Sequence, residues 1–212
     1  MLRTWQQCVS LVAGMCMALG VSAQTLTMAS PSPYQWVIEA GWNDGGDKMA
    51  DGNYVNTGKP WEIRAGKGVQ GGVGLQYAFN DQWATQFTMS YTVDSTNGTN
   101  GDAAFKRSPA EWMLIHNLND RWRVGAGWHQ SFSAKRTNTG VAALLGTENF
   151  KADSGAVVQL MYFFKPYTNY KLSGSEINAG LGLRYVTEQF TSEKTTRVYR
   201  ADHGGLFLGL YF

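Results

Sequence analysis

The chain has 212 residues and carries 18 Lys and Arg against 16 Asp and Glu, a formal net charge of +2 at pH 7. This near balance lacks the basic excess typical of nucleic-acid-binding proteins, and the length suits one domain. Both cysteines, Cys8 and Cys16, lie in the first 23 residues. The rest of the chain therefore has no thiol for disulfides, nucleophilic catalysis or metal binding.

The N-terminal residues have the order of features of a secretory signal peptide. Arg3 precedes the apolar run Cys8–Gly20, and Val21-Ser22-Ala23 supplies the small residues that a signal peptidase recognises. The alternative is an uncleaved anchor helix, but the run is shorter than the ~20 residues that span a bilayer. We predict a signal peptide over residues 1–23, a short segment over 24–33 and a β-domain over 34–212.

Beyond residue 33, apolar and polar residues alternate with a period of two, which predicts β-strands. In Trp122–Phe132, the even positions are apolar except Gln130, while Arg123, Gly125, Gly127 and His129 occupy odd positions. Segments of this kind are each close to the ~9–11 residues that a tilted strand needs to cross a membrane. In chain order the eight predicted strands are Gln35–Trp42, Gly68–Phe79, Gln82–Val93, Glu111–Leu118, Trp122–Phe132, Gly155–Phe164, Ile177–Thr187 and Gly204–Phe212.

The connections between these strands alternate in length. Asn80-Asp81 and Asn119-Asp120 suit tight turns, because Asn and Asp tolerate left-handed backbone and form local hydrogen bonds. Lys165–Ser175 is a looser third turn. The long polar linkers span 43–60, 94–108, 134–153 and 191–203. Short turns at one end and long loops at the other are typical of a transmembrane β-barrel.

A Trp follows each tight turn, since the sequence FNDQW of Phe79–Trp83 returns as LNDRW in Leu118–Trp122. Trp is favoured at membrane–water interfaces, where its ring is apolar and its N–H is polar. The predicted interface anchors are Trp36, Trp83, Trp122 and Trp128. A soluble β-sandwich with Trp in its core shows the same alternation and remains an alternative.

The C-terminal strand separates these alternatives. Leu206, Leu208, Leu210 and Phe212 alternate with Gly, Phe and Tyr residues, and the sequence stops at Phe212. In this strand, and in strand number and loop rhythm, the chain resembles the small bacterial outer-membrane β-barrels of the OmpA, OmpX and OmpW type. The resemblance implies an eight-stranded antiparallel barrel in the outer membrane, with short periplasmic turns and long extracellular loops. It also implies that Leu208, Leu210 and Phe212 form the insertion signal for the barrel-assembly machinery.

If the apolar faces contact lipid, the opposite faces point into the barrel. An eight-stranded barrel is just wide enough to be filled by its own side chains, so we expect a narrow lumen filled with polar groups. The predicted lumen network comprises Glu39, Glu111, Arg123, His129, Gln159 and Arg184. Glu62, Arg64 and Glu188 share the inward parity but can lie above the membrane. The pairing of these charges stays open, and solvation at the barrel rim is the alternative.

One pair of residues has the chemistry of a catalytic dyad. His129 and Ser131 share one face of a strand, and a His that removes a hydroxyl proton is the minimum for acyl transfer. The pair is similar to the His-x-Ser motif of outer-membrane lipid A deacylases. Phe132 stands where that family has Asn, and alternation turns the pair inward. We therefore predict no catalytic residue and no enzyme, with a lipid A acyl hydrolase as the weakest alternative.

Neither a cofactor nor a metal site is expected. Asp44, Asp47 and Asp51 do not have the spacing of a calcium loop and indicate a solvated loop. Basic residues at the outer strand ends suit lipopolysaccharide phosphates, or are ordinary solvated cations. They are Lys106, Arg107, Lys135 and Arg136.

The resemblance favours a structural or adhesive role, in which a rigid barrel presents surface loops to unidentified ligands. The expected partners are outer-membrane lipids, lipopolysaccharide and the barrel-assembly machinery, without nucleic acid. The alternative function is a channel for small solutes or hydrophobic compounds, of the OmpW type.

Overall fold

The computed structural model describes residues 32–54, 57–98, 101–140, 143, 146–169 and 177–212. These residues belong to one unit of the chain, Pro31–Phe212. The predicted signal peptide over 1–23 and nearly all of the 24–33 segment lie outside them. Among the described residues, no helix is both long and apolar enough to cross a membrane.

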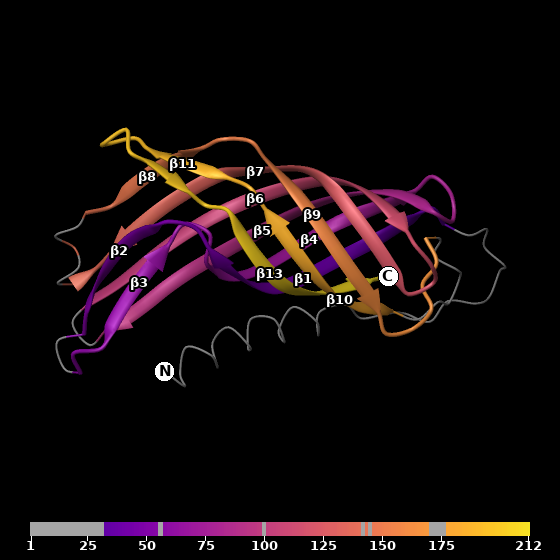
Figure 1. Cartoon of the computed structure of the whole chain (residues 1–212), viewed down its shortest axis with the longest axis horizontal. Helices are drawn as coiled ribbons and strands as arrows, with labels where there is room; N and C mark the ends of the chain where they lie inside the picture. Colours follow the sequence, from indigo (N-terminus) through magenta and orange to yellow (C-terminus); the bar gives the residue numbers. More distant parts are fainter. Residues whose placement is uncertain (1–31, 55–56, 99–100, 141–142, 144–145, 170–176) are drawn as a thin grey trace, which may run out of the picture. The chain divides into compact units, whose positions relative to one another are not determined.

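Eight strands pair in sequence and close into a barrel (Figure 1). The order is β7-β6-β5-β4-β1-β13-β10-β9, and β9 pairs back onto β7. Every pairing in this ring is antiparallel, which confirms the predicted fold class. The strands are β1 (Tyr34–Gly45), β4 (Gly68–Ala78), β5 (Trp83–Gly98), β6 (Gly101–Asn117), β7 (Trp122–Asn138), β9 (Gly155–Phe163), β10 (Asn178–Val186) and β13 (His203–Tyr211).

The two Asn-Asp turns have the same construction. Asn80 Oδ1 accepts hydrogen bonds from the backbone N–H groups of Gln82 and Trp83, at 2.9 and 2.8 Å. Asn119 Oδ1 accepts the equivalent pair from residues 121 and 122, both at 2.9 Å. The repeated sequence therefore encodes a repeated Asn-capped turn that aims a Trp outward at the start of the next strand. We call this end of the barrel the turn end.

The long connections contain further strands that the sequence did not predict, some of them within the predicted polar linkers. They are β2 (Lys48–Asn53), β3 (Pro60–Arg64), β8 (Glu148–Ala152), β11 (Gln189–Ser192) and β12 (Val198–Arg200). β8 pairs with the end of β7, β11 pairs with β8, and β12 pairs with β11, whereas β2 and β3 form a separate hairpin. Figure 1 shows β2, β3, β8 and β11 at the end of the barrel away from the C-terminus. We call this part the distal extension.

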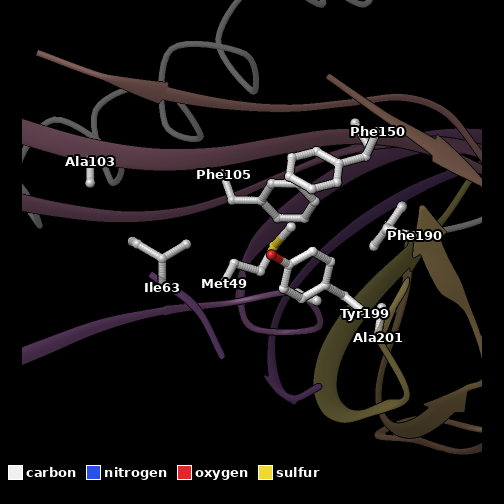
Figure 2. Close-up of a cluster of buried hydrophobic side chains, with 10 residues drawn as sticks. Met49, Ile63, Ala103, Phe105, Phe150, Phe190, Tyr199 and Ala201 are labelled. Atoms are coloured by element: carbon white, nitrogen blue, oxygen red, sulfur yellow. The ribbon is translucent and has the colours of Figure 1, made fainter. Parts of the chain in front are cut away.

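The distal extension has its own apolar interior (Figure 2). The ring of Phe105 lies 5.6 Å from that of Phe150 and 5.3 Å from that of Phe190, in edge-to-face contacts. Burial of aromatic side chains explains why polar-looking linkers fold into strands, because each strand contributes one or two apolar residues. This distal core comprises Met49, Ile63, Ala65, Ala103, Phe105, Ala134, Phe150, Phe190, Tyr199 and Ala201.

A β-bulge separates the barrel from the distal extension. Pro109 pairs with Ser131, but Arg107 pairs with Ala134, so β7 carries one extra residue. Phe132 is exposed at the bulge, and beyond it the even positions of β7 point inward. Because a bulge re-aims the side chains that follow it, the inward set above the membrane differs from a simple continuation of the alternation.

Two of the four cations predicted at the outer strand ends lie inside the protein. Arg107 and Arg136 are buried rather than available to lipid. Arg107 pairs with Glu188, at 3.3 Å between Nη1 and Oε2, and Arg136 pairs with Glu148, at 2.6 Å between Nη2 and Oε2. Two of the four predicted phosphate contacts are therefore internal ion pairs.

Candidate functional site

The centre of the barrel lumen holds a buried ion cluster around Arg184 of β10. Its Nη2 lies 2.7 Å from Oε2 of Glu39 and its Nη1 lies 2.9 Å from Oε2 of Glu111. The same Nη2 donates a hydrogen bond of 3.0 Å to Oε1 of Gln159. Four of the predicted lumen residues thus meet at one point, contributed by β1, β6, β9 and β10. Buried charges persist when they are paired in this way.

Toward the distal extension, the cluster continues through His129. Nδ1 of His129 lies 2.9 Å from Oε1 of Glu111, and Nε2 lies 3.4 Å from Oε2 of Glu188. Glu188 in turn pairs with Arg107, whose Nη2 donates to the carbonyl of Gly66 at 3.0 Å. Arg107 Nη2 also lies 3.3 Å from Nε2 of His203. We call this connected set of side chains the charged plug; it comprises Glu39, Arg107, Glu111, His129, Gln159, Arg184, Glu188 and His203.

Toward the turn end, Arg123 is stabilised differently. Among the described residues, no carboxylate lies within ion-pair distance of its fully buried guanidinium. Nη1 donates to Oε1 of Gln76 at 2.8 Å, and the guanidinium carbon lies 4.2 Å from the ring centre of Tyr211 and 4.9 Å from that of Phe163. Cation–π contacts replace a counter-charge here. Gln86 links Arg123 to the plug, because its Nε2 donates to Glu39 at 2.9 Å.

The connection after β9 folds into the turn end of the barrel. Tyr167 is buried and stacks on Phe163 with 4.0 Å between ring centres. Its hydroxyl donates to Oε1 of Gln35 and accepts from Nε2 of Gln76, both at 2.6 Å. Asn169 is also buried and donates to the carbonyl of Asn80 at 2.9 Å. The predicted loose turn is thus anchored through residue 169, while 170–176 lie outside the described residues.

Replacing Tyr167 with Phe is expected to destabilise the barrel by about 1–3 kcal/mol, since two buried amides each lose a partner. Urea unfolding in lipid vesicles, followed by Trp fluorescence, measures the change. Tyr34→Phe is the matched control, because Tyr34 is 53% exposed on the outer face. Equal midpoints for Tyr167→Phe and Tyr34→Phe would contradict the role of Tyr167.

One cavity in the barrel interior is large enough for about one water molecule. It lies beside the Arg184 cluster, where Asn43 Nδ2 donates to Oε1 of Gln70 at 2.8 Å. The residues around it are Glu39, Ala40, Gly41, Asn43, Gln70, Arg184 and Phe207. A space of this size fits solvent rather than an organic ligand.

The His129–Ser131 pair lacks the geometry of a nucleophile and its base. Both ring nitrogens of His129 face the carboxylates of Glu111 and Glu188. The hydroxyl of Ser131 is buried and has no hydrogen-bond partner among the described residues, while its backbone N–H donates to Oε1 of Glu188 at 3.1 Å. A nucleophile must reach its base to be activated, so this arrangement is that of a packed interior.

Glu62 and Arg64 lie on β3 and pair with each other at 2.7 Å, away from the charged plug. The hydrogen bond from Arg64 is the main cause of the lowered pKa of Glu62. Nearby Asp94 accepts a backbone hydrogen bond from Arg64 at 2.9 Å, yet burial raises the pKa of its carboxyl. These groups belong to the packing between the β2–β3 hairpin and the extended part of β5.

The sequence analysis did not place Arg107 in the barrel interior, and it did not identify several uncharged residues that lie there. Tyr211 shares the inward parity of the final strand with Gly209 and Phe207, so its position was readable from the alternation. Tyr167 carried no such signal, because it lies in a connection rather than a strand.

The outer face of the barrel is apolar along its strands. Trp36 is 60% exposed, and Trp83, Trp122 and Trp128 also point outward. Leu208 of β13 is exposed on the same face. A closed sheet satisfies its backbone hydrogen bonds internally, and an outward apolar band with aromatic residues suits lipid rather than water. The chain is a small eight-stranded transmembrane β-barrel. Interface anchoring and the insertion signal of Leu208, Leu210 and Phe212 remain predictions.

Solved outer-membrane barrels are similar to this barrel in fold. The attachment invasion locus protein Ail of Yersinia pestis, in complex with sucrose octasulfate, is 12% identical, with a TM-score of 0.44 over 84% of this chain and 99% of that chain. Neisserial surface protein A is 13% identical, with a TM-score of 0.42 over 86% and 98%. OprG of Pseudomonas aeruginosa is 13% identical, with a TM-score of 0.42 over 87% and 98%. No protein-family model and no curated protein matches the sequence. At these levels of similarity, the assignment rests on the barrel's own strand pairing.

Proposed function

We propose that this barrel lies in the bacterial outer membrane, has a structural or adhesive role and presents its distal extension at the cell surface. The observation that carries the proposal is the charged plug, in which Arg184 joins Glu39 and Glu111 across the lumen. A barrel filled by its own paired side chains serves as a rigid support rather than as a conduit.

Two further features support a closed lumen. At the turn end, Tyr167 and Asn169 pack into the barrel mouth. At the other end, the distal core packs Phe105 against both Phe150 and Phe190. Three successive layers of packed side chains therefore oppose solute passage.

The distal extension also supports a surface role. Its strands bury an apolar core, so that the polar side chains facing outward are held on a rigid frame instead of on separate loops. A backbone hydrogen bond connects the start of the β2–β3 hairpin to the end of β12. In this bond the N–H of Asp47 donates to the carbonyl of Arg200 at 2.7 Å. A preorganised surface loses less entropy on binding a partner than a flexible loop does.

The proposed partners are outer-membrane lipids, lipopolysaccharide and the barrel-assembly machinery. The channel alternative requires a path for solutes through the plug or sideways through the barrel wall. The acyl hydrolase alternative requires a hydrogen bond between His129 and the hydroxyl of Ser131.

The deciding experiment is reconstitution into planar bilayers and liposomes. We expect no stepwise conductance and no uptake of sugars, amino acids or apolar solutes, with a general porin in the same membranes as the positive control. Reproducible conductance steps, or uptake of any solute class above protein-free liposomes, would overturn the closed-barrel proposal in favour of a channel.

A further inference from the structure

Arg107 connects the ends of three strands of the distal extension to the barrel. Its Nη2 donates to the carbonyl of Gly66, two residues after β3, and its Nη1 lies 3.3 Å from Oε2 of Glu188, which directly precedes β11. The same Nη2 lies 3.3 Å from Nε2 of His203, three residues after the end of β12. One buried guanidinium therefore holds β3, β11 and β12 at the points where they join the barrel.

The contacts of His203 define its protonation state. Its Nδ1 lies 2.7 Å from the carbonyl oxygen of Ala201, so this nitrogen carries a proton and donates it. Its Nε2 faces Nη2 of Arg107, which can only donate, so this nitrogen is an unprotonated acceptor. Only the neutral imidazole, with its proton on Nδ1, makes both hydrogen bonds.

The surroundings of His203 oppose a second proton on its ring. Its partners in the sheet register are Gly45 of β1 and Val186 of β10, which carry no charge. The charged and titratable groups that face it come from β6, β7, β10 and the segment before β11, and they are Arg107, His129, Arg184 and Glu188. The carboxylate of Glu188 is already engaged by Arg107, so a buried imidazolium at position 203 would have no free counter-charge among these groups.

The other two histidines respond differently to acid. His129 has the carboxylates of Glu111 and Glu188 beside its two ring nitrogens, so a second proton there would be paired. His116 lies near the turn end, and its ring centre is 4.3 Å from that of Trp83. The chain has three histidines. Protonation of His203, unlike that of His129, therefore breaks an existing hydrogen bond.

We propose that His203 is an acid-sensitive latch, which holds the distal extension closed when neutral and releases it when protonated. An imidazolium loses the hydrogen bond from Arg107 and places a second positive charge against the guanidinium. The ends of β3, β11 and β12 then separate from Arg107, and the distal core becomes accessible to water. As a control of surface presentation, the latch rests on the surface role proposed above, whereas its chemistry depends only on the contacts of His203.

The direction of the pH dependence follows from proton binding. An exposed His takes up a proton near pH ~6.5, whereas the contacts of His203 in the closed extension disfavour that proton. The open extension therefore binds one more proton than the closed extension, so its population rises as the pH falls. With one linked proton, the ratio of open to closed protein should rise about tenfold for each pH unit below ~6.5.

The test is hydrogen–deuterium exchange of the folded protein in nanodiscs, read out by mass spectrometry. Exchange rates are divided by those of the unfolded chain at the same pH, which removes the intrinsic effect of acid on amide exchange. Peptides from residues 187–203 should lose about tenfold in protection per pH unit between about pH 6.5 and 4.5. Peptides from the barrel strands β4 and β10 should keep their protection.

Two matched variants assign the effect to one ring. His203→Gln cannot titrate, and its amide can still accept from Arg107 and donate to the carbonyl of Ala201, so the protection of residues 187–203 should not depend on pH. His116→Gln should lose protection as the native protein does. The proposal would be overturned by constant protection in the native protein, or by an equal loss in His203→Gln.

A second measurement decides the case of a His203→Gln protein that is open at every pH. The imidazole nitrogen NMR spectrum of the native protein at neutral pH should contain a neutral ring protonated at Nδ1 that is missing from the spectrum of His203→Gln. If the missing ring is an imidazolium or is protonated at Nε2, the latch is refuted. Conductance by the folded barrel would refute only the closed lumen, because exchange in the distal extension does not report solute passage, and the two failures are therefore distinguishable.

Discussion

Replacing Arg184 with Met is expected to destabilise the barrel by about 3–5 kcal/mol, the largest effect of any single change in the lumen. Arg184 contacts Glu39 and Glu111 at 2.7 and 2.9 Å, and all three side chains are buried. Breaking a buried ion pair leaves an uncompensated charge without access to water. Equilibrium unfolding in urea, in lipid vesicles, measures the difference from the native protein.

Additional substitutions can show whether Arg184→Met loses stability because charges are left unpaired or because packing is lost. In the Arg184→Met background, Glu39→Gln with Glu111→Gln removes the unpaired negative charges and should restore a large part of the stability. The two introduced amides would keep hydrogen-bonding capacity toward the other contacts of these positions, Gln86 and His129. If Arg184→Met unfolds at the native urea concentration, the ion cluster does not contribute to stability.

Replacing Phe105 with Ala is expected to open the distal extension while leaving the membrane barrel intact. Phe105 is 1% exposed and contacts Phe150 and Phe190. A buried Phe→Ala change costs about 3–5 kcal/mol. The strands β8, β11 and β12 have few residues each, so that loss should expose them locally. Limited proteolysis of the protein in vesicles, with mass mapping of the cut sites, measures the opening.

The expected cuts fall within residues 134–153 and 187–203, outside the barrel strands β9 and β10, and the protected barrel should keep its heat-dependent mobility. Val198→Ala is the matched control, because Val198 lies on β12 but is 52% exposed. Phe105→Ala protein as protease-resistant as Val198→Ala protein would show that the distal core does not hold the extension together.

Local sequence pattern was sufficient for the membrane-spanning part of the fold. The eight predicted strands agree with β1, β4–β7, β9, β10 and β13 to within a few residues at the turn end. The inward parity also placed Glu39, Glu111, Arg123, His129, Gln159 and Arg184 among the buried side chains. Alternation is a local property, because successive side chains of any strand point to opposite faces.

The alternating pattern did not predict the strands of the distal extension. Its strands are as short as the three residues of β12, and the linkers that contain them are polar, so neither length nor hydrophobicity marked them. They form because Phe105, Phe150, Phe190 and Tyr199, far apart in the sequence, meet in one core. Pairing of this kind depends on which segments closure of the barrel brings together.

The sequence by itself determined which residues form the barrel strands and which of their faces meets lipid, since both follow from a two-residue period and from the Asn-capped turns. Only the tertiary structure decided which charges pair. Arg184 and Glu39 are 145 residues apart, and the extra residue of β7 reverses the parity that would have buried Lys135 and exposed Arg136. Cross-lumen contacts and bulges depend on register and closure, which no local period specifies.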